Sequence, residues 1–239
     1  MLNLIKYEWL RRWKFFLAGI IAFLAANVDI ISRLIKQENP TALTAVLCGI
    51  LFALGMALVF DQIGRIYRPL FTDEGFLELT LPLNGYQYLG AKALAVAIEF
   101  GAVALFVVLV AYLDLVYINW VLPDWQLASI TWAEVLDFLQ AIGLTLGVYL
   151  IFILMIYLSL TLAKSLFASL KHGKLITFVA FLLVFKALDY FIDCWNIVRG
   201  YGNFGLSLTI AAQDWFLIAV VIGILFAGTG YLLDRKINL

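Results

Sequence analysis

The chain has 239 residues, of which 65% are hydrophobic and 13% are charged, and its formal net charge is zero. An average soluble domain carries about twice that share of charged residues, so this composition excludes an ordinary water-soluble protein. The absence of a basic excess gives no reason to expect a nucleic-acid partner. Apolar runs long enough to cross a bilayer recur along the chain, and lipid requires that such runs be helices. The predicted fold class is an all-α membrane protein.

The first element in chain order is the segment LNLIKYEWLRRWK, and we predict that residues 1–14 form a helix lying along the inner membrane surface. At 100° per residue, Leu2, Ile5 and Trp9 share an apolar face with Trp13. Indole rings and cations favour the headgroup region. The predicted membrane-interface residues are Trp9, Trp13, Arg11 and Arg12. The alternative is a plain cytosolic extension of the first span.

Residues 15–239 are predicted to form one six-span domain. The expected spans are Phe15–Leu34, Ala45–Ile66, Ala93–Tyr117, Leu136–Leu162, Leu175–Ile192 and Trp215–Leu233. Small residues recur at a spacing of four along several of them, as in Gly143-Gly147 and Ala219-Gly223-Ala227. Such stripes allow helix backbones to approach closely, either within the chain or between subunits.

The distribution of the 16 Lys and Arg residues predicts the orientation. Four of them fall on one side of the expected spans: Arg33, Lys36, Lys186 and Arg199. The other twelve fall on the opposite side: Lys6, Arg11, Arg12, Lys14, Arg65, Arg68, Lys92, Lys164, Lys171, Lys174, Arg235 and Lys236. Because cytoplasmic loops are enriched in cations, both termini are expected in the cytosol.

The connection between the second and third spans, Tyr67–Lys92, is acidic on the side where cations prevail. Its segment TDEGFLELTLP predicts a short amphipathic helix over about residues 73–83, ended by Pro82, with Asn84 as a cap for the following helix. The apolar face of this helix would be exposed to water unless it bound a partner or the membrane. The inner leaflet is negative and repels acidic residues, so a protein partner is a better cover than the membrane surface.

Ionisable residues within the spans are candidates for function. Glu99 lies in the third span, where it either makes an interhelical hydrogen bond or lines a polar pathway. Lys186 and Asp189 lie near the outer end of the fifth span. For these two, the alternative to a pathway is an ion pair across one helical turn whose members extend outward.

Several kinds of chemistry have no motif in this chain. There is no HExxH zinc motif and no GxxxxGK[ST] phosphate loop, and the single histidine, His172, has no orienting partner. Cys48 and Cys194 lack metal-ligand spacing and are expected to be free thiols rather than a disulfide. We therefore expect no catalytic residues, no metal site and no cofactor site in the chain.

Four features together resemble the permease subunits of bacterial type-2 ATP-binding-cassette (ABC) exporters. They are the opening LIKYEW at Leu4–Trp9, the loop FTDEGFLELTLPLNGYQYLGAKAL at Phe71–Leu94, the six-span plan and the ending LLDRKINL at Leu232–Leu239. The resemblance implies that Asp73–Pro82 is a coupling helix that docks into a groove on an ATPase. The contact residues would be Asp73, Glu74, Gly75, Phe76, Leu77, Leu79 and Pro82.

The resemblance also implies the partners and the setting. Two permeases, identical or paralogous, would enclose a pathway in the bacterial cytoplasmic membrane, and two ATPase subunits would bind ATP and Mg²⁺ below them. This chain would be a transport subunit, not an enzyme, and its aromatic, uncharged spans favour an amphipathic peptide, drug or lipid-like substrate. The family often has short re-entrant helices between the last two spans, whereas glycines interrupt the corresponding Trp195–Asp214 segment here.

Two rival functions share part of this pattern. A non-transporting membrane anchor or immunity protein would also recruit a cytosolic partner through the inner loop, but without an ATP-dependent change of state. An ion-coupled secondary carrier would instead use Glu99 and the cluster around Lys186, and it would tolerate loss of the loop side chains.

Overall fold

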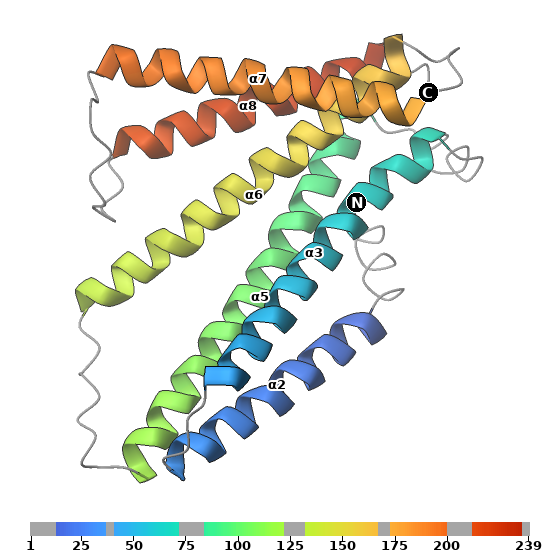
Figure 1. Cartoon of the computed structure of the whole chain (residues 1–239). Coiled ribbons are helices and arrows are strands. Elements are labelled where there is room, and N and C mark those ends of the chain that lie inside the picture. Colours follow the sequence, from blue (N-terminus) through green and yellow to red (C-terminus); the bar gives the residue numbers. More distant parts are fainter. Residues whose placement is uncertain are drawn as a thin grey trace. The chain divides into compact units, whose positions relative to one another are not determined.

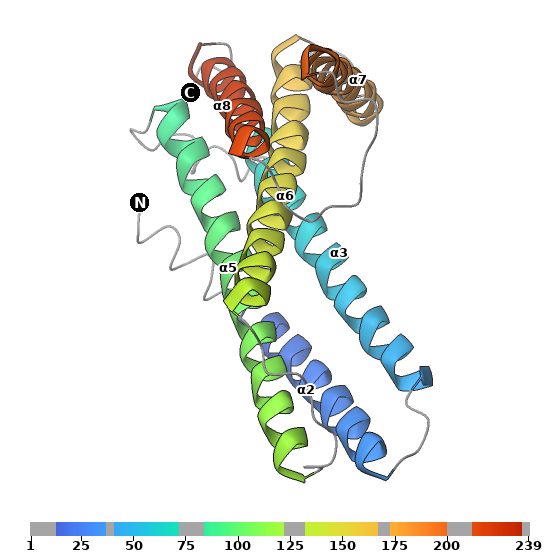
Figure 2. The same cartoon turned by 90° about the vertical axis from the view of Figure 1, so that its left-hand side faces the viewer.

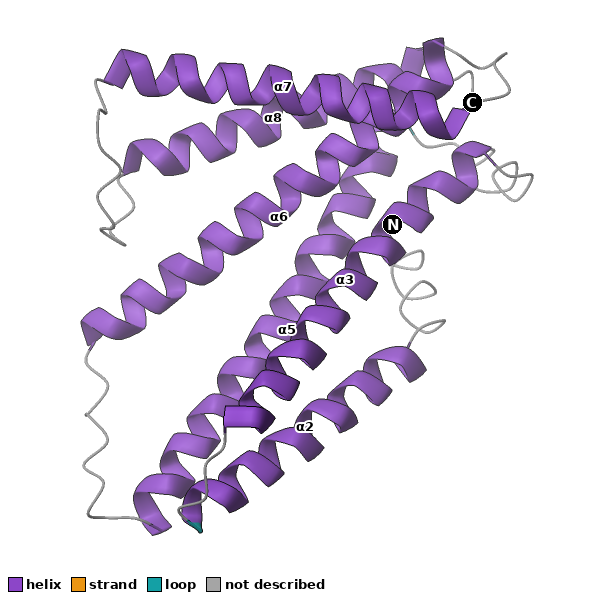
Figure 3. Ribbon diagram, viewed as in Figure 1, coloured by secondary structure: helices purple, strands orange, loops and turns teal. Residues whose placement is uncertain are grey.

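The computed structural model describes residues 13–36, 41–71, 84–121, 132–166, 173–199 and 212–235. The elements of this described part are all α-helices (Figure 3). They are α2 (Trp13–Ile35), α3 (Thr41–Phe71), α5 (Gly85–Val121), α6 (Trp132–Leu166), α7 (Gly173–Arg199) and α8 (Ala212–Arg235) (Figure 1). In the described part of the chain, six helices are long and apolar enough to cross a membrane, as predicted, which indicates a multi-pass membrane protein.

Several helices extend past the expected ends of their spans. α3 continues to Phe71 rather than ending at Ile66, α5 starts at Gly85 rather than at Ala93, and α7 continues to Arg199 rather than ending at Ile192. At 1.5 Å per residue, α5 is about 55 Å long, whereas the hydrocarbon core of a bilayer is about 30 Å thick. Hydropathy identifies only the apolar part of a helix, and the polar ends of α3 and α5 were therefore assigned to the connection between them. As a result, the predicted connection Tyr67–Lys92 was too long.

The described chain folds into two compact units, and two of the three boundaries between them fall inside helices. One lies in α3 between Asp61 and Gln62, one lies in α5 between Ala97 and Ile98, and the third coincides with the start of α6 at Trp132. Unit 1 contains α2, the first part of α3 and the second part of α5, and Figure 2 shows α2 beside this part of α5. Unit 2 contains the remaining parts of α3 and α5 together with α6, α7 and α8.

The core of unit 2 forms where α6 packs against α7 and α8. Its fully buried side chains include Leu89 from α5, Ile153 and Tyr157 from α6, and Leu233 from α8. Large apolar side chains such as Leu183 on α7 remain exposed, which is typical of surfaces that face lipid.

The glycine stripe on α6 brings this helix close to α8. A Cβ atom added to Gly143 would lie 2.7 Å from Cη2 of Trp215, and one added to Gly147 would lie 2.9 Å from Cγ2 of Ile218. The predicted close packing is therefore confirmed for Gly143-Gly147, and its partner is a helix of the same chain. A Cβ atom added to Gly223 would meet no atom within 4 Å.

This difference predicts opposite outcomes for two matched substitutions. Gly147→Val should lower thermal stability, because overpacking against β-branched Ile218 costs about 1–3 kcal/mol. Gly223→Val should leave stability nearly unchanged, because the added atoms enter open space. Size-exclusion chromatography of heated, detergent-solubilised protein measures both. Equal stability of the two variants would contradict the packing of α6 against α8.

Two buried hydroxyl groups of unit 2 bond to their own helices. Ser159 Oγ donates to the carbonyl of Met155 at 2.7 Å, and Thr229 Oγ1 donates to that of Leu225 at 2.7 Å. A hydroxyl that bonds one turn back is satisfied without help from another helix. These side chains are therefore explained by the fold and are not candidates for a binding site.

Candidate functional site

The residues predicted to contact an ATPase, Asp73, Glu74, Gly75, Phe76, Leu77, Leu79 and Pro82, lie outside the described residues. Trp9, Arg11 and Arg12 of the predicted interfacial segment also lie outside them, and Trp13 is the first residue of α2. The coupling and interfacial helices therefore remain predictions. The structure does describe the two helix ends that flank residues 72–83.

The end of α3 is packed against the end of α6. Leu70 is buried in the core of unit 2, and the rings of Tyr67 and Phe71 stack with their centroids 4.9 Å apart. From α6, Lys164 places Nζ 5.6 Å from the centroid of the Phe71 ring, which is a cation–π distance. The residue that directly precedes the inner loop is thus held by a second helix.

The start of α5 is capped by Asn84. The backbone N–H groups of Gln87 and Tyr88 donate to the Asn84 carbonyl at 2.9 and 3.0 Å. This is the position of an N-cap residue, whose carbonyl accepts the first intrahelical bonds. The predicted cap is therefore confirmed, and Gly85 is the first helical residue.

The same end of α5 is in backbone contact with the end of α8. The Gly85 N–H donates to Oδ1 of Asp234 at 3.3 Å, and a Cβ atom added to Gly85 would lie 2.8 Å from the Asp234 backbone nitrogen. A Cβ atom added to Gly230 would collide with the ring of Tyr86. Only glycine allows this approach, because any side chain at Gly85 or Gly230 would separate the two helix ends.

These contacts define a structure that we name the loop anchor. It consists of Tyr67, Leu70, Phe71, Gly85, Tyr86, Lys164, Gly230, Leu233 and Asp234. The inner loop therefore starts from a helix packed on α6 and returns to a helix packed on α8. The anchor also joins two helix ends that are far apart in sequence, the start of α5 at Gly85 and the last turns of α8 at Gly230–Asp234.

Two cations near the loop occupy positions that the sequence did not predict. Arg65 is 5% exposed and Lys92 is 2% exposed, and both belong to unit 2. Lys92 Nζ lies 5.4 Å from the centroid of the Tyr88 ring. The prediction that Lys92 ends the connection between the second and third spans was wrong. α5 begins at Gly85, about two turns before Lys92, and Lys92 is a buried residue of that helix.

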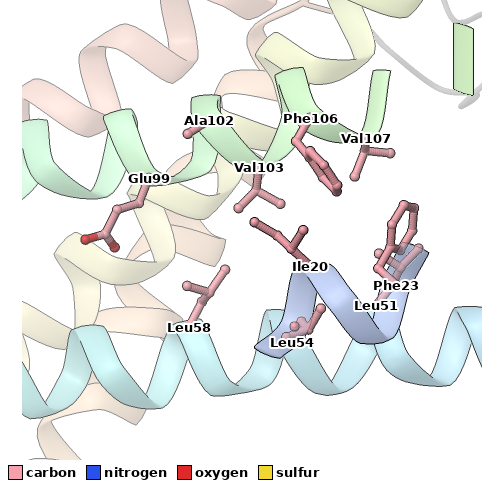
Figure 4. A pocket seen from close by; sticks show the side chains of 11 residues that line it. Ile20, Phe23, Leu51, Leu54, Leu58, Glu99, Ala102, Val103, Phe106 and Val107 are labelled. Carbon is pink, nitrogen blue, oxygen red and sulfur yellow. The ribbon is translucent and has the colours of Figure 1, made fainter. Parts of the chain in front are cut away.

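Unit 1 contains a cavity beside a buried acid. Glu99 is 4% exposed and lies about four turns from the start of α5, deeper along the helix than the expected span start implied. The cavity has a volume of about 170 Å³ and lies between α2, α3 and α5 (Figure 4). Its lining is Gly19, Ile20, Phe23, Leu51, Leu54, Leu58, Glu99, Ala102, Val103, Phe106 and Val107.

Close contacts between the three helices shape this cavity. A Cβ atom added to Gly19 of α2 would lie 2.6 Å from Cδ2 of Leu54 on α3. The rings of Phe23 on α2 and Phe106 on α5 meet edge to face, with centroids 5.8 Å apart. Of the lining, the sequence identified Glu99 alone, because the surrounding Leu, Ile and Val side chains look the same whether they face lipid or a cavity.

A polar contact joins α2 and α5 elsewhere in unit 1. Asn27 Nδ2 donates a short hydrogen bond to Oδ2 of Asp114 at 2.7 Å. On α2, Arg33 Nε lies 3.8 Å from Oδ2 of Asp29. Asp114 and Asp29 thus each have a polar partner within unit 1.

The acid and lysine of the fifth span form a surface pair. Lys186 Nζ lies 3.2 Å from Oδ2 of Asp189, and their side chains are 76% and 50% exposed. The predicted pairing across one turn is confirmed, and neither residue lines the Glu99 cavity. This exposed pair provides little support for an ion pathway.

The described residues contain no group of three or more His, Cys, Asp or Glu side chains that could hold a metal ion, and Cys48 and Cys194 are free thiols. No known protein family, curated protein or solved structure matches the chain. Its own residues must therefore carry any functional conclusion.

Proposed function

We propose that the protein is the membrane-spanning permease subunit of an ATP-driven ABC exporter. It would form the substrate pathway with a second copy or a paralogue, and separate ATPase subunits would supply the energy. The observation that carries this proposal is the loop anchor, because it fixes both ends of the acidic, apolar segment 72–83 to packed helices. A segment that transmits force needs rigid attachments of this kind.

The two helices that flank the inner loop would receive that force first. These are α3 and α5, and each contributes residues to both units. A movement imposed on Asp73–Pro82 by closure of an ATPase dimer would pass directly along these two helices. Contacts at the anchor would also engage α6 through Lys164 and α8 through Asp234. Transport would then follow from different substrate affinities of the inward-facing and outward-facing states.

The remaining parts of the proposal follow from the charge pattern and the resemblance. The chain would lie in the bacterial cytoplasmic membrane with both termini and the inner loop in the cytosol. Its substrate would be an amphipathic peptide, a drug or a lipid-like molecule. ATP and Mg²⁺ would be bound by the partner subunits.

Purification of the tagged chain from its native membrane in a mild detergent tests this proposal. We expect an ATPase subunit with a GxxxxGK[ST] motif to copurify, identified by mass spectrometry, and the complex to hydrolyse ATP. The matched control is the same preparation from cells that carry the tag on an unrelated membrane protein. Recovery of the chain with no nucleotide-binding partner would contradict the proposal.

A secondary carrier is the second candidate, favoured by the burial of Glu99 beside a cavity. It predicts transport driven by an ion gradient in vesicles that contain the chain alone. Transport that persists without ATP and stops when a protonophore collapses the gradient would establish the carrier in place of the exporter.

A further inference from the structure

The cavity of unit 1 has the size of a small binding site. Its volume of about 170 Å³ is similar to that of engineered apolar cavities of about 150 Å³, which hold a single benzene ring. Three helices of one unit form its walls, and Ile20 and Val103 are exposed at its rim. The cavity is therefore not fully enclosed by the three helices.

The lining combines apolar side chains with one ionisable side chain. Among the described residues that line the cavity, Glu99 is the only ionisable one, and it is 4% exposed. Figure 4 shows Glu99 at one end of the cavity and Phe23 at the other. Pockets of this composition, mostly apolar with one placed polar group, orient an amphipathic ligand.

The carboxyl group of Glu99 indicates which kind of ligand the cavity favours. A buried carboxylate is stabilised by an opposite charge, and the aromatic rings of Phe23 and Phe106 offer contacts to an aromatic or branched apolar group. A carboxylate has about four acceptor positions, so Glu99 can meet a ligand while it keeps contacts within the protein.

We infer that the cavity between α2, α3 and α5 binds an amphipathic monocation that carries one ring or a branched group of similar size, with its charge at the Glu99 end. This inference concerns binding and stands independently of the exporter proposal. If the site holds the transported molecule, it narrows the substrate class to small hydrophobic cations, and that extension rests on the proposed function.

Calorimetric titration of the purified full-length chain in detergent tests the inference. The probes are benzyltrimethylammonium and its neutral isostere neopentylbenzene, each corrected with a protein-free micelle blank. We expect the cation to bind at least about tenfold more tightly than the isostere, because only the cation gains from the buried carboxylate. Glu99→Gln should remove this preference.

Two further variants control for shape and for charge. Val103→Phe should fill the cavity and abolish binding of the cation while the Glu99 carboxylate stays in place. Asp137→Asn removes an acid at an exposed position of α6, in unit 2 and away from the cavity lining, and it should leave the cation affinity unchanged. Equal binding of the two probes by the unmodified chain would overturn the inference and indicate a pocket for a lipid chain.

Retained cation binding in Val103→Phe would also overturn it, by placing the ligand elsewhere. These measurements use no ATPase and no nucleotide. Failure of the cation to bind therefore leaves the exporter proposal intact, and failure to recover an ATPase leaves the binding result intact.

Discussion

Phe76→Asp is expected to abolish copurification of the ATPase and its stimulated ATP hydrolysis, while membrane insertion is retained. Phe76 is the aromatic residue of the acidic segment, and in the proposed complex its ring enters an apolar groove. Burying a carboxylate there without a partner is unfavourable. Loss of an aromatic anchor commonly costs 2 kcal/mol or more, so affinity should fall by roughly 30-fold at least.

The matched control for this substitution is Gln87→Asp. Gln87 is exposed on the first turn of α5, close to the inner loop, so this change adds the same charge without touching the predicted docking face. It should retain the ATPase and its activity. Wild-type stimulation of hydrolysis in Phe76→Asp would refute the coupling role of the segment, and an equal loss in Gln87→Asp would indicate a general effect of charge.

Gly85→Ala is expected to destabilise the protein, although alanine is normally the better helix former. The added Cβ atom would lie 2.8 Å from the backbone nitrogen of Asp234 and 3.0 Å from the carbonyl oxygen of Gly230. Backbone atoms cannot rotate away as side chains do, so α5 and α8 must separate at the loop anchor. A cost of about 1–3 kcal/mol corresponds to a fall of roughly 3–10 °C in melting temperature.

Gly90→Ala is the control, because it adds the same atom to the same helix. The nearest atom to a Cβ at Gly90 is Cζ of Phe226 at 3.8 Å, an ordinary contact. Removal of a helical glycine there should leave the melting temperature unchanged or raise it, since alanine is favoured by up to about 1 kcal/mol. Melting temperatures that shift in the same direction for both variants would contradict the backbone contact between α5 and α8.

Patterns within short stretches of the sequence predicted the spans, one helix cap and one ion pair of this protein. Each span was recognisable because about 20 apolar residues suffice to cross a bilayer, and Asn84 was recognisable as a cap from its place before a helix. The pairing of Lys186 with Asp189 followed from their spacing, because residues three apart lie on one helix face. These features depend on neighbours within one or a few turns, so sequence alone was sufficient for them.

Contacts between distant segments required the tertiary structure. Glu99 stood out in the sequence as a charge in an apolar span, but the cavity beside it depends on how Gly19 and Leu54 bring α2 and α3 together. Lys92 had the appearance of a loop cation and is buried instead. Composition cannot distinguish a side chain that faces lipid from one that faces a neighbouring helix, because both surroundings are apolar.

The amino-acid sequence was sufficient to predict the helical membrane class, the six spans, the acidic inner loop and the charge asymmetry that indicates orientation. Each of these depends on hydropathy, charge or spacing along a single segment. The packing of Gly143 and Gly147 against α8 and the contact of Gly85 with Asp234 became evident from the three-dimensional arrangement of the helices. Such contacts depend on shape across helices, where the absence of a side chain matters as much as its chemistry.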